Sequence, residues 1–241
     1  MMQKNPSGYI TSTLLSGVPG VVHGFSTRAL SDMRNNIASK VFLKILSLDD
    51  TLFEMPEQVH GSDVAVIRSS DTFGEKYKGV DGLVGFRNTI GILVADCVPL
   101  IAVDPVAHII GAAHAGWKGT IGGIATRLIE IMQKEGAKTD RILVSIGPHI
   151  GMCCYDVPDE RAQRFLIGFN ENPKVVSEIN TIWHVDIGYA NFLQLKHAGI
   201  ALEHIDAPPV CTKCQRDDFY SYRRDTKETF GEMLGVIGFR I

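Results

Sequence analysis

The sequence predicts an α+β fold with a mixed or layered sheet. Strand-like apolar runs and helix-like amphipathic runs follow one another irregularly, whereas a doubly wound fold would alternate them strictly. The 241 residues contain no internal repeat, no low-complexity tract and no linker rich in proline, glycine and serine. A chain of this length forms one large domain or two small ones. Because nothing in the sequence divides it, we expect residues 1–241 to form a single domain.

Strands are predicted where β-branched or alternating apolar residues are bounded by turn residues. The predicted strands span residues 58–67, 89–94, 100–103, 108–113, 141–146 and 235–241. The third and fourth are separated by Asp104 and Pro105, which favour a turn, so they are expected to pair. Three strands carry a metal-binding residue type near one end. These residues are His60 near the start of the first strand, Cys97 after the second and His114 after the fourth.

Helices are predicted where apolar residues recur with a period near 3.6. The predicted helices span residues 41–46, 120–136 and 186–197. In the second, Ile121, Ile124 and Leu128 share one face, and Gly136 supplies a C-terminal stop. In the third, Asp186 is the expected N-cap.

The composition excludes several classes of function. Lys plus Arg number 24 against 27 Asp plus Glu, a net charge of -3, so no overall basic field attracts nucleic acid or an anionic membrane. Residues 1–25 lack the apolar run of a signal peptide, and no stretch approaches the roughly 20 apolar residues of a membrane span. Five cysteines, an odd count, indicate reduced thiols or metal ligands rather than a secreted disulfide framework. We expect a cytoplasmic protein that is a monomer or a small homo-oligomer.

His60, Cys97 and His114 can converge in space although they are far apart in the sequence. Two imidazoles and one thiolate suit Zn²⁺, and three protein ligands leave a fourth position open, as at a catalytic zinc. The same residues also allow a cysteine hydrolase, with Cys97 as the nucleophile and His114 as its base. His60 favours the metal site because a dyad does not need it. Several copper ions would require further histidines, so copper is less expected than zinc.

The other cysteines and one basic segment carry weaker signals. Cys211 and Cys214 form a lone C-x-x-C, too little for a structural zinc site without a second pair. The adjacent Cys153 and Cys154 are expected to pack as small apolar side chains. Residues 219–225 combine aromatic and cationic groups, which suits either phosphate or carboxylate recognition or an alternating strand with one wet face.

Six motifs occur in an order that resembles one known family. They are EQVHG at 57–61, DGLV at 81–84, ADCVPL at 95–100, AHAGW at 113–117, GPHIG with CYDV within 147–157, and FYSYRRD at 219–225. Together, from about residue 25 to the C-terminus, they resemble the bacterial laccase-domain (YfiH-type) proteins. Members of this family were formerly labelled multicopper polyphenol oxidases and are now regarded as purine nucleoside phosphorylases with adenosine deaminase activity.

The resemblance implies a single-domain mixed β-sandwich flanked by helices, a fold akin to that of toxin-type cysteine deamidases. It implies zinc bound by His60, Cys97 and His114. The implied reactions are phosphorolysis of adenosine, inosine and methylthioadenosine to a free base and ribose 1-phosphate, and deamination of adenosine. The kinship with deamidases keeps the Cys97–His114 hydrolase as an alternative, with a role in peptidoglycan precursor editing. The older polyphenol oxidase label is a further alternative.

The two implied reactions need a proton carrier and cations. Asp96 is expected either to shuttle a proton or to orient a metal ligand. Arg28, Lys118 and Arg223 are the expected phosphate-binding groups, unless they form ordinary surface ion pairs. The sequence departs from the family pattern at three places, because the loop after Arg28 is shortened, Lys118 replaces an arginine, and Glu232 replaces an arginine with reversal of charge. These departures bear on the choice of nucleoside.

Overall fold

The strands form two large sheets and one small sheet. The computed structural model describes residues 2–68, 77–207 and 210–240, and the strands in these ranges make up two six-stranded sheets and one three-stranded sheet. In pairing order, the first sheet consists of β1 (Met2–Asn5), β2 (Tyr9–Ser12), β3 (Val21–Ser26), β15 (Met233–Phe239), β7 (Thr89–Val94) and β4 (Phe53–Glu54). The second consists of β14 (Ile205–Asp206), β10 (Leu143–Ile146), β8 (Val98–Asp104), β9 (Ile109–Ala115), β6 (Gly82–Gly85) and β5 (Val64–Val66). The small sheet consists of β11 (Asp156–Val157), β13 (Ile182–Val185) and β12 (Val176–Ile179).

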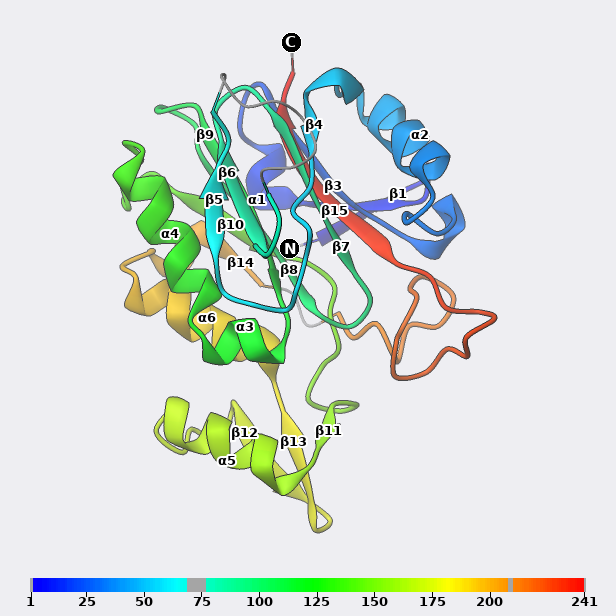
Figure 1. Ribbon diagram of the computed structural model, residues 1–241, viewed down its shortest axis with the longest axis vertical. Helices are drawn as coiled ribbons and strands as arrows, with labels where there is room; N and C mark the ends of the chain where they lie inside the picture. The colour runs from blue at the N-terminus through cyan, green and yellow to red at the C-terminus, as the bar shows by residue number, and fades with distance from the viewer. Residues whose placement is uncertain (1, 69–76, 208–209, 241) are drawn as a thin grey trace.

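The two large sheets face each other, and helices cover their outer faces (Figure 1). The α-helices are α1 (Thr13–Ser16), α2 (Asn36–Leu46), α3 (Trp117–Ile121), α4 (Ile124–Lys134), α5 (Asp159–Gly168) and α6 (Ile187–His197). The 3-10 helices are η1 (Arg28–Leu30), η2 (Asp50–Leu52) and η3 (Leu202–His204). Helix α2 packs on the first sheet, and α4, with α6 beside it, packs on the second. This order of layers confirms the predicted α+β fold.

Strand β8 shows how the sequence pattern produces these layers. Ile101 and Val103 point into the core between the two sheets, whereas Leu100 and Ala102 point into the core beneath α4. Successive side chains of a strand point to opposite faces. Because both faces of β8 are buried, the strand reads as an unbroken apolar run rather than as an alternating one.

Most of the predicted strands are confirmed, with bounds that differ by a few residues. They are β7, β8, β9, β10 and β15, for the predictions at residues 89–94, 100–103, 108–113, 141–146 and 235–241. Strands β8 and β9 pair antiparallel, as the turn residues between them indicate. His114 lies inside β9 rather than after it, and Ile241 lies outside the described residues.

The strand predicted at residues 58–67 is wrong over its first half, since only Val64–Val66 is a strand. The backbone amides of Val59, His60 and Gly61 donate to the carboxylate of Asp81 instead of to a neighbouring strand. A side-chain acceptor of this kind competes with a sheet ladder. This segment is therefore a loop that presents His60.

The predicted helices are confirmed at residues 41–46 and 186–197, and the third prediction needs a correction. Helix α2 begins earlier than predicted, because Asn35 caps it, and Asp186 caps α6 as expected. The helix predicted at 120–136 is two helices, α3 and α4, that break at Gly122 and Gly123. Gly123 has a φ of 81°, and a Cβ on Gly122 would lie 2.8 Å from the hydroxyl of Ser62.

In the described ranges, the structure has no helix long and apolar enough to span a membrane. The longest α-helices, α2, α4 and α6, have 11 residues each. A membrane-spanning helix needs roughly 20 residues.

Candidate active site

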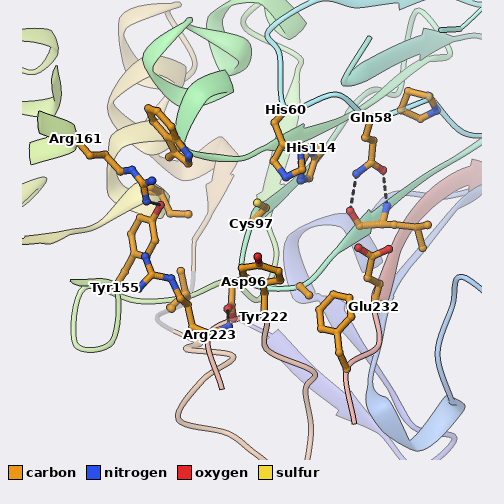
Figure 2. A pocket seen from close by; sticks show the side chains of 17 residues that line it. Gln58, His60, Asp96, Cys97, His114, Tyr155, Arg161, Tyr222, Arg223 and Glu232 are labelled. Carbon is orange, nitrogen blue, oxygen red and sulfur yellow. Dashed lines mark hydrogen bonds between the residues drawn. The ribbon is translucent and has the colours of Figure 1, made fainter. Parts of the chain in front are cut away.

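A cavity of about 760 Å³ lies at one end of the two large sheets. Helix α5 and the small sheet project from the same end (Figure 1). Its walls come from the loop before β5, the β7–β8 turn, the end of β9, the first residue of α3, the loop between β10 and β11, α5, the start of α6 and the C-terminal loops. Among the ionisable side chains that line it are His60, Cys97, His114, Arg161, Arg223 and Glu232 (Figure 2). The cavity therefore combines metal-binding, cationic and acidic groups.

His60, Cys97 and His114 meet on one wall of this cavity, as expected from the sequence (Figure 2). One potential ligand atom of each lies within 4.8 Å of those of the other two. The two imidazole rings meet edge to face, with centroids 4.8 Å apart. This donor set is compatible with one metal ion, and three protein ligands leave a coordination position for water or substrate.

Asp81, which the sequence places in a motif without a specific role, fixes the positions of both histidines. Its side chain is fully buried, and its Oδ1 lies 2.8 Å from Nδ1 of His114. It also accepts hydrogen bonds from the amides of Val59, His60 and Gly61 at 3.2, 2.9 and 2.6 Å. A carboxylate on Nδ1 leaves Nε2 of His114 for a metal and makes it a stronger ligand. The signal in the sequence is an aspartate directly before a buried apolar strand.

The backbone around the three side chains is adapted to crowding. His60 and Asp96 have φ values of 61° and 79°, in the left-handed region that residues other than glycine seldom adopt. Gly116 makes room for the site, because a Cβ there would lie 3.1 Å from both Sγ of Cys97 and Cδ2 of His60. Such conformations persist at functional sites where surrounding contacts hold them.

The thiol and the imidazoles influence each other's ionisation. Burial opposes ionisation of Cys97, yet His114 and His60 lower the pKa of its thiol to about 7. Burial also opposes protonation of His114, yet the Cys97 thiolate and the Asp81 carboxylate raise its pKa to about 10. Burial would likewise raise the pKa of Asp81, but hydrogen bonds from His114 and Gly61 bring that pKa below its ordinary value. A thiolate paired in this way is suited to bind a metal or to act as a nucleophile.

Asp96 joins the turn that carries Cys97 to the C-terminal loops. Its Oδ1 accepts a hydrogen bond from the hydroxyl of Thr212 at 2.6 Å. Its Oδ2 accepts hydrogen bonds from the hydroxyl of Ser221 at 3.0 Å and from the amide of Arg223 at 2.8 Å. These contacts favour the expectation that Asp96 orients the site over the expectation that it shuttles a proton. Either role stays a prediction.

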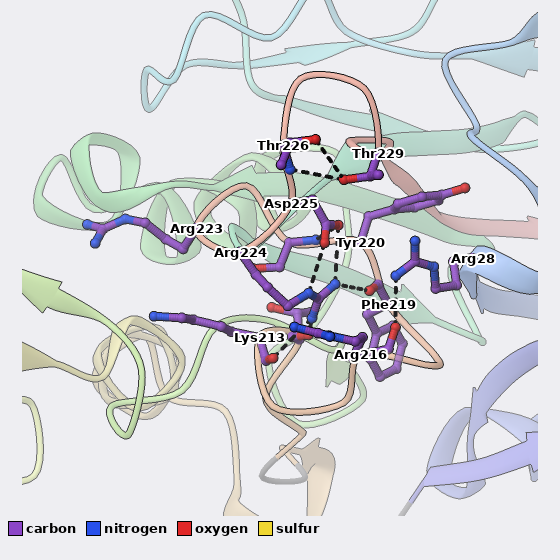
Figure 3. Close-up of polar contacts among 12 residues, drawn as sticks. Arg28, Lys213, Arg216, Phe219, Tyr220, Arg223, Arg224, Asp225, Thr226 and Thr229 are labelled. Atoms are coloured by element: carbon purple, nitrogen blue, oxygen red, sulfur yellow. Dashed lines mark hydrogen bonds and ion pairs between the residues drawn. The ribbon is translucent and has the colours of Figure 1, made fainter.

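The three predicted phosphate-binding cations lie in different places. Arg223 lines the cavity. Residues 219–225 contain a turn at 222–224 and no strand, so the alternating strand that the sequence allows is not formed. Arg28 and Lys118 are not among the described residues that line the cavity. The guanidinium of Arg28 donates to the carbonyl of Arg216 at 2.9 Å (Figure 3). Their roles in binding phosphate stay predictions.

Arg161 of α5 is a cavity residue that the sequence does not reveal. Its guanidinium lies 4.3 Å from the ring centroid of Trp117 and donates to the hydroxyl of Tyr155 at 3.2 Å. The guanidinium of Arg223 lies 5.0 Å from the ring centroid of the same tyrosine. The two cations thus flank one wall, although Arg161 looks in the sequence like any charged residue of an amphipathic helix.

Glu232 faces the metal-binding side chains across the cavity (Figure 2). Burial raises the pKa of its carboxyl, an effect that the positive charges of Arg34, His114 and His60 oppose without cancelling. The backbone amide of Glu232 donates a hydrogen bond to the carboxylate of Asp32 at 3.0 Å. The charge reversal noted in the sequence therefore places an acidic group inside the cavity.

Comparisons with known sequences agree with the motifs. Residues 16–240 match the family model described as multi-copper polyphenol oxidoreductase laccase. The purine nucleoside phosphorylase YlmD of Geobacillus stearothermophilus is 38% identical over 203 residues, which cover 76% of this chain and 71% of that protein. The adenosine deaminase RL5 of an unknown prokaryotic organism is 39% identical over 189 residues, which cover 74% of this chain and 71% of that protein.

Solved structures show the same fold. The crystal structure of YlmD from Geobacillus stearothermophilus superimposes with a TM-score of 0.87 at 31% identity, covering 100% of this chain and 99% of that one. The crystal structure of YfiH from Bacillus licheniformis gives a TM-score of 0.87 at 28% identity, covering 99% of this chain and 98% of that one. With the motifs, the sheet arrangement and the family match in agreement, this chain belongs to the laccase-domain (YfiH-type) family.

Proposed function

We propose that this protein is a zinc-dependent purine nucleoside enzyme of the cytoplasm. It cleaves adenosine, inosine and methylthioadenosine with phosphate to the free base and ribose 1-phosphate, and it deaminates adenosine. The observation that carries the proposal is the His60–Cys97–His114 group on the wall of a cavity of about 760 Å³ that also holds two guanidinium groups. The names of two relatives, a purine nucleoside phosphorylase and an adenosine deaminase, support the substrate class.

The three side chains fit a zinc ion by their chemistry. Two imidazole nitrogens and one thiolate are favourable zinc donors, and Asp81 fixes the tautomer of His114 in which Nε2 is free to bind. Gly116 keeps the space beside Sγ of Cys97 clear. When bound with an open position, a zinc ion supplies Lewis-acid chemistry to a water or a substrate oxygen.

The aromatic residues of the cavity provide a surface for the purine. Tyr222 and Phe230 meet edge to face with ring centroids 5.8 Å apart, and both line the cavity. Tyr222 is 71% exposed, so its ring is accessible to a ligand. A purine base stacks readily on such rings, and each stacked base contributes about 1–3 kcal/mol.

Two cations of the cavity support the phosphate-binding part of the proposal. Arg161 and Arg223 approach Tyr155 from two sides, and planar guanidinium groups bind phosphate through paired hydrogen bonds. In phosphorolysis they hold the phosphate and offset its charge as it approaches C1′ of the ribose. Arg28 and Lys118 lie outside the described cavity lining and have no part in this proposal.

The proposal gives different roles to the two carboxylates, Asp96 as a positioning group and Glu232 as a proton carrier. Asp96 accepts three hydrogen bonds from protein groups and positions the turn of Cys97. Glu232 has a raised pKa because of its burial, which suits a carboxyl that takes up and returns a proton. In deamination, Glu232 carries the proton to the leaving amine.

The test is product analysis on the purified protein as isolated, by HPLC after incubation with adenosine. Without phosphate, inosine is the expected product, and with phosphate, adenine and hypoxanthine appear as well. Cys97→Ala abolishes both reactions, and Glu232→Gln lowers inosine formation far more than adenine formation. Turnover that persists in a zinc-free Cys97→Ala protein contradicts the metal mechanism. Absence of all products from the zinc-loaded wild type contradicts the proposed substrates.

A cysteine hydrolase is the second candidate, and the pKa of about 7 at Cys97 favours it. In this mechanism the Cys97 thiolate attacks an amide or amidine carbon while His114, positioned by Asp81, exchanges the proton. The two candidates differ at His60, which a dyad does not require. A hydrolase retains activity after chelation and in His60→Ala, and iodoacetamide inactivates the chelated protein. A zinc enzyme loses its activity in both cases.

A further inference from the structure

Four cysteines gather outside the cavity, where the sequence indicates no site. Cys153 and Cys154 lie in the loop between β10 and β11, and Cys211 and Cys214 lie in the loop after β14. The four sulfur atoms lie within 4.8 Å of one another. The expectation that the adjacent pair packs as small apolar side chains is wrong for Cys153, which is exposed and whose sulfur faces Cys214. Cys154 is partly buried and packs against the core beneath α4. The two loops supply the second pair that a lone C-x-x-C lacks.

The sulfur separations match those of a tetrahedral thiolate site. Sγ of Cys214 lies 3.7 Å from that of Cys153 and 3.4 Å from that of Cys154. Four sulfurs at a zinc–sulfur distance of about 2.3 Å in tetrahedral geometry lie about 3.8 Å apart. All four thiols are free, and the measured separations are far longer than the bond of about 2.05 Å in a disulfide. The spacing therefore suits a shared cation.

The surrounding backbone stabilises the charged form of one cysteine. The amide of Gly151 donates to Sγ of Cys211 at 3.3 Å. Amides that donate to sulfur also accompany thiolates in metal clusters. The Gly151 amide thus supplies a hydrogen-bond donor to the first sulfur of the C-x-x-C turn.

The two loops are held together independently of the sulfurs. The amide of His149 donates to the carbonyl of Val210 at 3.2 Å, and the amide of Thr212 donates to the carbonyl of His149 at 3.0 Å. Arg224 donates to the carbonyls of Thr212 and Lys213 at 2.8 and 3.0 Å (Figure 3). These bonds fix the C-x-x-C turn and bring a positive charge beside it. The four cysteines therefore lie on loops that hydrogen bonds already join.

We propose that Cys153, Cys154, Cys211 and Cys214 form a tetrathiolate site that binds one structural Zn²⁺. Binding replaces the thiol protons, which pass to solvent, by four zinc–sulfur bonds, and no oxidant or reductant is needed. Four protein ligands fill the tetrahedron, so the ion has no open position for substrate. Its role is to clamp together the loops that carry Tyr155 and, through Thr212, the hydrogen bond to Asp96. The proposal does not rest on the reaction at the cavity.

The test separates the two sites by substitution and counts metal. Protein purified under reducing conditions is loaded with Zn²⁺, desalted and analysed for zinc by mass spectrometry. The wild type is expected to hold about two zinc ions per chain, and Cys97→Ala about one. The double variant Cys97→Ala with Cys214→Ser is expected to hold none. Lys213→Ala in the Cys97→Ala background is the matched control in the same turn, and it retains one ion.

A second measurement reads the ligands directly and needs no further variant. Co²⁺ added to metal-free Cys97→Ala protein reports tetrahedral thiolate coordination through a sulfur-to-cobalt charge-transfer band, and an equivalent of Zn²⁺ removes it. One ion per chain with this band supports the site. A folded Cys97→Ala protein without bound zinc and without the band overturns it. Mass spectra that show a disulfide among the four cysteines under reducing conditions also overturn it.

Discussion

The cavity group and the four-cysteine group are two ways to arrange metal-binding side chains in one small protein. His60, Cys97 and His114 come from a loop, a turn and a strand and share a cavity wall. The four cysteines come from two loops, and Cys153 and Cys214 are exposed. Three ligands in a cavity leave room for a reactant, whereas four thiols complete a tetrahedron. The number of ligands and their access to a cavity distinguish a reactive site from a clamp.

The two groups also differ in the contacts that hold their ligands. A fully buried carboxylate, Asp81, orients His114 and the loop of His60. At the cysteines, the backbone amides of Gly151 and Cys214 donate to sulfur instead. A carboxylate strengthens an imidazole ligand, while amides stabilise a thiolate without adding negative charge. Each donor type thus has the neighbour that its chemistry requires.

Chelation provides the largest expected contrast between the two sites. A small chelator such as dipicolinate is expected to enter the cavity, to remove the proposed ion from its three ligands and to abolish turnover. The proposed four-thiolate site is expected to keep its ion until a mercurial reagent modifies the thiols. Zinc content measured against time is expected to fall from about two per chain to about one. Loss of both ions at one rate would contradict the distinction, as would retained activity after the first loss.

Asp81→Asn is expected to weaken only the cavity site. The amide preserves the shape of the side chain but removes the charge that orients His114 and supports the amide of His60. Substitution of such a partner lowers metal affinity or activity about 10–100-fold. Competition with a fluorescent zinc indicator measures the affinity of each site in Cys214→Ser and Cys97→Ala backgrounds. An equal loss at the cysteine site would indicate general misfolding.

Asp104 is a buried carboxylate remote from both sites, so the variant Asp104→Asn serves as a comparison for Asp81→Asn. Asp104 is fully buried and accepts hydrogen bonds from three backbone amides and from Arg141. The variant is expected to lose about 2 kcal/mol of unfolding free energy and to retain both zinc ions. Urea unfolding of each protein, with metal content measured alongside, checks both expectations.

The same variant gives a pH dependence of known sign. Burial would raise the pKa of Asp104, but its hydrogen bonds bring that pKa below its ordinary value. The ionised carboxylate therefore stabilises the fold above the unfolded-state pKa of about 3.9, and this contribution disappears as pH falls through the lower folded-state pKa. The difference between wild type and Asp104→Asn is expected to be constant from about pH 7 to 5 and to shrink below about pH 4. A difference that grows in acid would reverse the assignment.

The smallest expected effects come from the cations around the cavity. Arg223→Ala removes a guanidinium from the cavity wall and is expected to raise KM for phosphate roughly tenfold, the equivalent of one charge-assisted hydrogen bond. Lys118→Ala, outside the described lining, is expected to change KM less than about twofold. Steady-state kinetics at varied phosphate concentration compares them. A larger effect at Lys118 would restore the role that the sequence suggests for it.

The sequence was sufficient to predict most strands of the two large sheets and the convergence of His60, Cys97 and His114. Strands β7, β8 and β9 are unbroken apolar runs, because both of their faces are buried. The strand prediction failed at residues 58–61, because hydrogen bonds to the carboxylate of the distant Asp81 replace strand pairing there. The prediction of one continuous helix failed at Gly122 and Gly123, where the chain approaches Ser62 closely. The sequence also missed Arg161, whose significance comes from the cavity that it faces.

Local pattern determined the α+β class and the cap at Asp186, because hydrophobic period and capping depend on neighbouring residues. The order of the motifs along the chain identified the laccase-domain family. The pairing of Cys153 and Cys154 with Cys211 and Cys214, and the entry of Glu232 into the cavity, depend on loops far apart in the sequence. Sequence spacing sets no distance between such loops. Their separation follows from how the sheets pack, so these groups emerge only when the chain is folded.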